Sequence, residues 1–271
     1  MQKIKVAMLD LISKVFDHID HVLVPGVPHE RWRNFVQSIE PVNNGFNLIR
    51  VGPDSEGSYL LPDDLDGIRL NISPGVGETW QFESALLNSF NIPSLMIDAS
   101  VDKPDNLPKE IEFLNHFLVP ISGSNSGVSI SELVSQAALK YGEDADLLLQ
   151  MDIEGAEFDC LKWVEERDLD KFRILAIEFH DMELWVQNSF FTRTIEPVFE
   201  RLLERFDVVH SRANNHARTF FYKGYFIPSA LELTFHRKDR FKGPREARHL
   251  PTELDIVNKQ FTSQRTPFEK K

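Results

Sequence analysis

The stretch from Leu147 to Leu161 constrains the fold of this chain more than any other. It begins with the mostly apolar run 147–151 and leads directly into three acids, Asp152, Glu154 and Glu157. An apolar run of this length fits a strand that is buried on both faces, as in a parallel sheet. The acids then fall at the carboxyl end of that strand, where open α/β sheets bind ligands.

Three carboxylates so close together repel one another, so they are costly to gather unless something uses them. An acidic helix N-terminus is the structural alternative, because the helix dipole favours negative charge there. The dipole explains Glu157 well and Asp152 poorly. A functional role is therefore predicted for Asp152.

Strand and helix patterns alternate along the chain from residue 68. Short β patterns are predicted at 68–72, 94–97, 117–121, 147–151, 174–177, 208–210 and 231–235, and amphipathic helices at 80–90, 129–141, 158–166 and 192–206. Strands that alternate with helices form βαβ units and a mostly parallel sheet. The predicted fold class is therefore α/β.

Two more helices are predicted before this region, at 6–23 and 30–39, and periodicity is lost after residue 242. A chain of 271 residues suggests one large domain or one domain with an appendage. The predicted organisation is an N-terminal helical cap or lid at 1–45, a main domain at 46–242 and a polar C-terminal tail at 243–271.

Composition excludes several classes of function. The chain has 30 Lys and Arg against 42 Asp and Glu, a net charge of −12, and an acidic chain binds nucleic acid poorly. No apolar run approaches the ~18 residues of a membrane span, and no secretory signal is evident. The single cysteine, Cys160, allows no disulfide within the chain and is predicted to be a small buried residue. A cytoplasmic protein with neither nucleic-acid nor membrane partners is expected.

A glycine loop precedes the helix predicted at 80–90. Gly75 and Gly77 follow the strand at 68–72, and Asp98 ends the next strand about twenty residues later. Glycines allow close approach of a ligand, and an acid at that offset can accept hydrogen bonds from both hydroxyls of a ribose. NAD and S-adenosylmethionine both fit this pattern. The third glycine of the dinucleotide fingerprint is absent, and a cationic cofactor without a diphosphate suits an acidic site better.

Four segments, in order, resemble those of one known family. They are RVGPDSEGSY at 50–59, SPGVGETWQFE at 73–83, MDIEGAE at 151–157 and IEFH at 177–180, with a looser fifth match at Asn214-Asn215 and 228–235. The chain resembles the FkbM type of class I S-adenosylmethionine-dependent methyltransferases over about residues 46–238. The run at 151–157 is the most diagnostic. Ser58 departs from the pattern, since the family has a glycine there.

The resemblance implies a Rossmann-like sheet of seven strands, six parallel and one antiparallel, with helices on both faces. It also implies S-adenosylmethionine as cofactor, bound at the carboxyl ends of the first strands. The loop Gly75-Val76-Gly77 would lie against the amino-acid moiety and Asp98 against the ribose. Ser122 would flank the adenine, and Asp152 would face the sulfonium and the acceptor together.

Two roles remain open for the strand end Glu178-Phe179-His180. A neutral His180 could take the proton of an acceptor hydroxyl, because a base with a pKa near 7 suits that task; alternatively, it hydrogen-bonds a loop. A divalent metal held by Asp152, Glu178 and a neighbour is a second possibility. Acceptor contacts are assigned to the last strands and the residues between them, namely His210, Asn214, Asn215 and Glu232.

The predicted function is O-methylation of a hydroxyl group on a small-molecule acceptor, a sugar or another natural product, with His180, Asp152 and Glu178 as catalytic residues. A non-catalytic protein that binds a cofactor or partner on the same fold is one alternative. A nicotinamide-dependent oxidoreductase is another, because it shares the glycine loop and Asp98.

Overall fold

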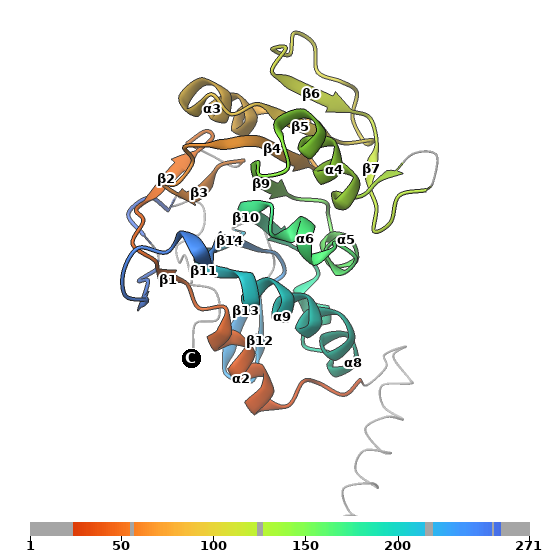
Figure 1. The fold of residues 1–271 in the computed structure, drawn as a ribbon. Helices are drawn as coiled ribbons and strands as arrows, with labels where there is room; N and C mark the ends of the chain where they lie inside the picture. Colours follow the sequence, from red (N-terminus) through yellow and green to blue (C-terminus); the bar gives the residue numbers. More distant parts are fainter. Residues whose placement is uncertain (1–23, 55–56, 124–126, 215–218, 251, 256–271) are drawn as a thin grey trace, which may run out of the picture.

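The computed structural model describes residues 24–54, 57–123, 127–214, 219–250 and 252–255 (Figure 1). The helix predicted at 6–23, Asn215 and the end of the predicted tail lie outside these ranges.

A sheet of seven strands forms the centre of the protein (Figure 1), in the order β11-β14-β10-β9-β4-β5-β6. The neighbouring strands β6, β5, β4, β9 and β10 pair in parallel. Strand β14 pairs antiparallel with both β10 and β11. Six strands therefore run in one direction and one in the other, which confirms the predicted fold class. The strands are β4 (Ile68–Pro74), β5 (Ser94–Ile97), β6 (Ile111–Leu114), β9 (Asp146–Met151), β10 (Phe172–Phe179), β11 (Phe206–Ala213) and β14 (Leu231–Arg237).

The predicted helices from residue 30 onward are present, with shifted ends. The segment predicted at 158–166 is divided into α5 and α6, and the one predicted at 192–206 begins as a π-helix. No helix in the described ranges is long and apolar enough to span a bilayer. The helices are α2 (His29–Ser38), α3 (Gln81–Phe90), α4 (Ile130–Tyr141), α5 (Glu157–Lys162), α6 (Glu166–Leu169), α7 (Met182–Trp185), α8 (Asn188–Phe190), the π-helix (Phe191–Ile195), α9 (Glu196–Arg205) and a 3₁₀-helix (Lys238–Arg240).

In the part of the chain that the structure describes, four short strand pairs lie outside the main sheet. They are β1 (Val42–Asn43) with β15 (Glu246–Ala247), β2 (Leu48–Val51) with β3 (Tyr59–Pro62), β7 (Phe117–Leu118) with β8 (Gly127–Val128), and β12 (Thr219–Tyr222) with β13 (Tyr225–Pro228).

The third strand of the sheet was predicted in the wrong segment. The strand expected at 117–121 is only the short β7, and its Phe117 is 56% exposed. The sheet instead takes β6, whose Ile111 pairs with Ser94 of β5. As an edge strand, β6 turns Glu112 to solvent, where Lys140 of α4 binds it at 2.5 Å. An edge strand carries polar residues, so its sequence lacks the continuous apolar run that predicts a buried strand.

Strand β9 is covered on both faces, as its apolar run predicted. Leu147, Leu149 and Met151 belong to the core that includes residues of α4, α5 and α9. Leu148 belongs to the opposite core, with residues of α3 and the β2–β3 hairpin. Because both faces are covered, the strand end is what remains to meet a ligand.

Helix α2, the described part of the predicted cap, shares a core with α9. The rings of Trp32 and Phe35 pack against Phe191, and Phe35 also packs against Phe199 with ring centroids 5.1 Å apart. The main-chain N–H of Val27 donates to the carbonyl of Val186 at 2.9 Å. The division of the chain into cap, main domain and tail stays a prediction.

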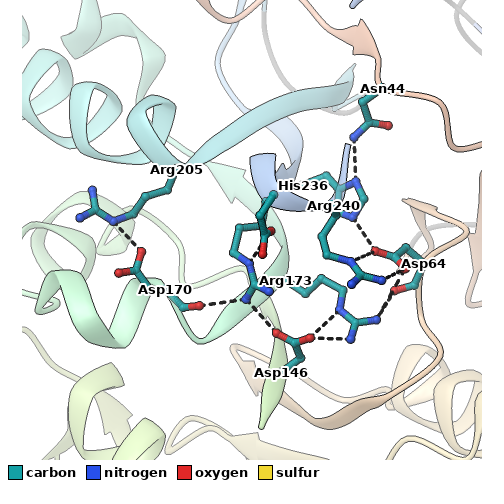
Figure 2. Close-up of polar contacts among 10 residues, drawn as sticks. Asn44, Asp64, Asp146, Asp170, Arg173, Arg205, His236 and Arg240 are labelled. Carbon is teal, nitrogen blue, oxygen red and sulfur yellow. Dashed lines mark hydrogen bonds and ion pairs between the residues drawn. The ribbon is translucent and has the colours of Figure 1, made fainter. Parts of the chain in front are cut away.

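Charged side chains form a network of hydrogen bonds and ion pairs at the end of the sheet where β9 begins (Figure 2). Asp146, at the start of β9, accepts hydrogen bonds from Arg173 (Nε at 3.0 Å) and Arg237 (Nη1 at 2.8 Å). Asp64 accepts from Arg240 at 2.7 Å and from His236 at 3.0 Å. A hollow of about 450 Å³ lies beside Asp146. Its wall is rich in charges that are paired with one another, and it is at the opposite end of β9 from Asp152.

Candidate active site

The carboxyl ends of four neighbouring strands bring the predicted site residues to one edge of the sheet. Strands β5, β4, β9 and β10 lie side by side in that order and run in parallel. Asp98 follows β5, the glycine loop follows β4, Asp152 follows β9 and His180 follows β10. Sequence segments more than 100 residues apart therefore meet at this edge.

The glycine loop and the acidic loop touch through their backbones. Gly75 has φ +83°, and its N–H donates to the carbonyl of Ile97 at 2.9 Å. A Cβ on Gly75 would overlap the carbonyl oxygen of Asp152 and lie 2.5 Å from its carbonyl carbon. The N–H of Asp152 donates to the carbonyl of Pro74 at 3.2 Å. Only glycine fits at position 75, both for its φ and for this approach.

Asp98 lies directly beside the glycine loop. Its Oδ2 accepts the N–H of Gly77 at 3.0 Å, and its Oδ1 accepts the N–H and hydroxyl of Ser100 at 2.8 and 2.6 Å. Burial raises the pKa of Asp98, but the hydrogen bonds from Ser100 and Gly77 outweigh it and the pKa is lowered. The carboxylate is therefore ionised at neutral pH.

The acidic loop is folded around Glu157, which is fully buried. Its Oε1 accepts the N–H groups of Ile153 at 3.3 Å and Gly155 at 3.0 Å, and the Nδ1 of His180 lies 2.9 Å away. Burial raises the pKa of Glu157, but the hydrogen bonds from His180 and Gly155 outweigh it and lower the pKa. An ionised carboxylate only accepts hydrogen bonds, so Nδ1 of His180 carries the hydrogen.

The other ring nitrogen of His180 faces three more carboxylates. Nε2 lies 3.7 Å from Asp152, 3.6 Å from Glu154 and 3.9 Å from Glu178. These distances are too long for hydrogen bonds. Among the described residues, Oδ1 of Asp152 is buried without a hydrogen-bond partner.

Burial and the neighbouring charges shift the pKa values of both Asp152 and His180. Burial first, and then repulsion from Glu178, raise the pKa of Asp152 to about 8. Burial lowers the pKa of His180, but the hydrogen bond to Glu157 and the charges around the ring outweigh it and raise the pKa to about 9. His180 is therefore a charged imidazolium at neutral pH unless another cation is bound beside it.

Three side chains could together hold a metal ion. One ligand atom each from Asp152, Glu154 and His180 lies within 4.8 Å of the others. The sequence had suggested Glu178 as the partner of Asp152, and this group contains Glu154 in its place. Divalent Mg²⁺ needs near-octahedral coordination, so water or acceptor oxygens would have to complete it.

Of the residues assigned to the acceptor, His210 lies on β11, Glu232 lies on the neighbouring strand β14, and Asn214 follows directly after β11. Glu178 accepts a hydrogen bond from Asn214 at 2.6 Å, and it is paired across the strands with Glu232. Glu232 forms an ion pair with Arg212. Burial raises the pKa of Glu232 to about 7, although Arg212 opposes this.

Two predicted site residues have partners away from His180. His210 is buried, and its Nε2 lies 3.0 Å from Asp255. The hydroxyl of Ser122 is 2.8 Å from that of Ser129, the N-cap of α4. The roles assigned to both residues stay predictions.

The contacts of two residues in this region were not predicted from the sequence. Glu157 had been assigned to the helix dipole, and the 151–157 run alone gave no sign that His180 would bind it. Asp255 lies in the predicted polar tail, yet it is bonded to His210. No local pattern indicates that contact.

Residues 131–210 match the family model described as the methyltransferase FkbM domain. The matched segment holds the acidic loop and His180, whereas the glycine loop and Asp98 precede it. The match confirms the resemblance predicted from the sequence and supports methyltransferase activity.

No curated protein matches the chain. Among solved structures, it is similar to a chain in a crystal structure of a fibrillarin/Nop5p complex, with 12% sequence identity. The similarity covers 63% of this chain and 73% of that one, with a TM-score of 0.34. A score at that level carries no argument about function.

Proposed function

We propose that this protein is an FkbM-type, S-adenosylmethionine-dependent O-methyltransferase whose acceptor is a hydroxyl group on a sugar or another natural product. One observation carries the proposal. The ionised Asp98, the glycine loop, Asp152 and His180 form a continuous group along one edge of the sheet.

The residues of this edge fit such a cofactor. When bound, S-adenosylmethionine supplies an electrophilic methyl group on a positively charged sulfur. Asp98 can accept hydrogen bonds from the ribose hydroxyls, and the loop 75–77 can approach the amino-acid moiety closely. Ser122 is assigned to the adenine side. The orphaned Oδ1 of Asp152 and the surrounding carboxylates favour a cation beside them.

His180 is proposed to be the general base. Nε2 of His180 would take the proton of the acceptor hydroxyl, and bound S-adenosylmethionine would supply the methyl group that the acceptor oxygen receives. A base at pKa about 9 is protonated at neutral pH, but a cation bound beside it lowers that pKa by repulsion. Asp152 and Glu178 are proposed as catalytic residues beside His180, and Asn214 and Glu232 are proposed to hydrogen-bond the acceptor. The roles of His210 and Asn215 rest on their positions in the sequence.

Two measurements test the cofactor and the chemistry. Calorimetry with S-adenosylhomocysteine should show binding, and incubation of a producing-cell extract with S-adenosylmethionine carrying a labelled methyl group should yield a labelled acceptor by mass spectrometry. Removal of the base should slow turnover by about 100- to 10,000-fold, so His180→Ala should lower the rate and leave cofactor affinity nearly unchanged. Absence of heat and of any thermal shift at millimolar ligand would refute the proposal.

A bound divalent ion is the second candidate for activating the acceptor, favoured by the closeness of Asp152, Glu154 and His180. An ion there would lower the pKa of the acceptor hydroxyl directly. Chelator treatment followed by magnesium or manganese decides between the two. Loss and recovery of activity would assign the activation to the ion, whereas unchanged activity would leave it with His180.

The same assays separate the other functions. A non-catalytic binding protein would bind S-adenosylhomocysteine and transfer no methyl group to a broad panel of hydroxylated acceptors. A nicotinamide-dependent oxidoreductase would change the absorbance of NADH with carbonyl substrates.

A further inference from the structure

The carboxylate of Glu157 has an unusual set of partners for a residue in the first turn of a six-residue helix. Acids in a first turn normally face solvent and act on the helix dipole. Glu157 is instead fully buried, and one oxygen receives three hydrogen bonds. Two come from the loop that carries Asp152, and one comes from His180, which lies 23 residues further along the chain.

The carboxylate of Glu157 is hydrogen-bonded to both sides of a loop whose backbone is strained. Glu154 has φ +54°, and Gly155 has φ +107°. A left-handed conformation is costly for a residue with a Cβ and persists only where the surroundings impose it. The bonds from Ile153 and Gly155 to Glu157 close the loop on either side of Glu154.

The second loop is fixed to the first at the same place. Asp181, directly after His180, also has a left-handed conformation, with φ +52°. A Cβ on Gly155 would lie 3.0 Å from Oδ2 of Asp181. The two loops therefore pack closely, and Glu157 is the side chain that is bonded to both.

We propose that Glu157 is a positioning residue that holds the imidazole of His180 by its Nδ1–H and so directs Nε2 toward Asp152 and Glu178. This inference rests on the proposed role of His180 as the base. An imidazole that donates from Nδ1 to a fixed acceptor has its lone pair at Nε2 when neutral. The same carboxylate stabilises the imidazolium that forms when Nε2 takes a proton.

Glu157→Gln is the most informative variant. The amide oxygen of glutamine can still accept the N–H groups of Ile153 and Gly155, so the loop keeps its bonds. The negative charge is lost, and an amide can present either an acceptor or a donor to Nδ1. Asp159→Asn is the matched control, because Asp159 is an exposed acid in the same first turn of α5. It removes the same charge from the helix end without touching His180.

Nuclear magnetic resonance of protein with ¹⁵N-labelled histidine tests the geometry without any ligand. In the native protein, His180 should show a downfield N–H proton on Nδ1, absent in His180→Ala. The signal should be lost or moved in Glu157→Gln and unchanged in Asp159→Asn. His210 and His236 are internal controls for folding, because they are bonded through Nε2 to Asp255 and Asp64.

A native His180 signal that reports hydrogen on Nε2 alone, or one that Glu157→Gln leaves in place, would overturn the proposal. If Glu157→Gln loses the His210 and His236 signals as well, Glu157→Asp replaces it. The shorter aspartate side chain keeps the negative charge but places it farther from Nδ1 of His180, so the His180 signal should still move. An unmoved signal in that variant would count against the proposal.

Kinetics with the acceptor found by methyl labelling separates positioning from a structural role. Glu157→Gln should lower kcat at least about tenfold and leave the affinity for S-adenosylhomocysteine within about twofold. In a His180→Ala background, Glu157→Gln should lower kcat by less than a further factor of about two, because the effects of residues that act as a unit are not additive. An equal loss in both backgrounds would contradict positioning but leave the proposed function standing. If no variant, native included, transfers a methyl group, the proposed function fails, and the resonance data still decide the geometry.

Discussion

Replacing Gly75 by alanine should destabilise the protein much more than the same change at Gly77. Both residues have positive φ, +83° and +63°, so both variants carry the cost of a left-handed alanine, about 1–2 kcal/mol. They differ in what the new methyl group meets. At Gly77 nothing lies within 4 Å, whereas at Gly75 the methyl carbon would lie 2.5 Å from the carbonyl carbon of Asp152.

The obstacle at Gly75 is backbone, so no change of rotamer can relieve it. Inserting a methyl group into well-packed surroundings typically costs about 1–3 kcal/mol. Since the left-handed cost is common to both variants, this figure is the expected difference between them. For a domain of this size, 1 kcal/mol corresponds to about 2–4 °C in Tm. Gly75→Ala should therefore melt about 2–12 °C below Gly77→Ala.

Thermal unfolding followed by circular dichroism at neutral pH measures both variants beside the native protein. The melting temperature of Gly75→Ala should also rise less with S-adenosylhomocysteine, because the displaced backbone belongs to Asp152. If the two variants melt within about 1 °C of each other, the close approach of the glycine and acidic loops is not a rigid feature of the fold. The reasoning from the position of the methyl group would then be wrong.

Asp98→Ala should weaken S-adenosylhomocysteine binding by about tenfold or more in calorimetry, because charge-assisted hydrogen bonds of up to about 1.5–3 kcal/mol each are lost; the exposed Asp105→Ala is the control and should bind normally. Burial raises the pKa of Asp64, but hydrogen bonds from Arg240 and His236 outweigh it and lower the pKa. Its contribution to stability is therefore complete above the unfolded value of about 3.9 and is lost as the pH falls through the lower folded value. Asp64→Asn should cost about 1.5–3 kcal/mol in urea unfolding at pH ~7 and much less at pH ~2, since the charge-assisted hydrogen bond from Arg240 is lost only where the native carboxylate is ionised. Cys160 is 2% exposed, and burial raises its pKa to about 12; mass spectrometry should find it alkylated by iodoacetamide only after unfolding, and rapid labelling of the native protein would contradict this.

Local sequence determined six of the seven strands of the main sheet and its mostly parallel direction. The apolar run before Asp152 predicted a strand covered on both faces, and β9 is such a strand. The glycine loop and Asp98 were predicted to bind different parts of one cofactor, and the N–H of Gly77 donates to Asp98. Side-chain periodicity is a property of neighbouring residues, so it can be read without knowing the path of the chain.

The bonds of the acidic site were decided only by tertiary structure. Glu157 looked like a helix-end acid, because its position in the first turn is local and its bond to His180 is not. That bond joins two separate loops, in which Glu154 and Asp181 have left-handed backbone conformations. The contact of His210 with Asp255 spans 45 residues and has no local pattern either. Periodicity specifies which face of an element is buried, whereas a hydrogen bond between loops depends on backbone angles that only the complete fold sets.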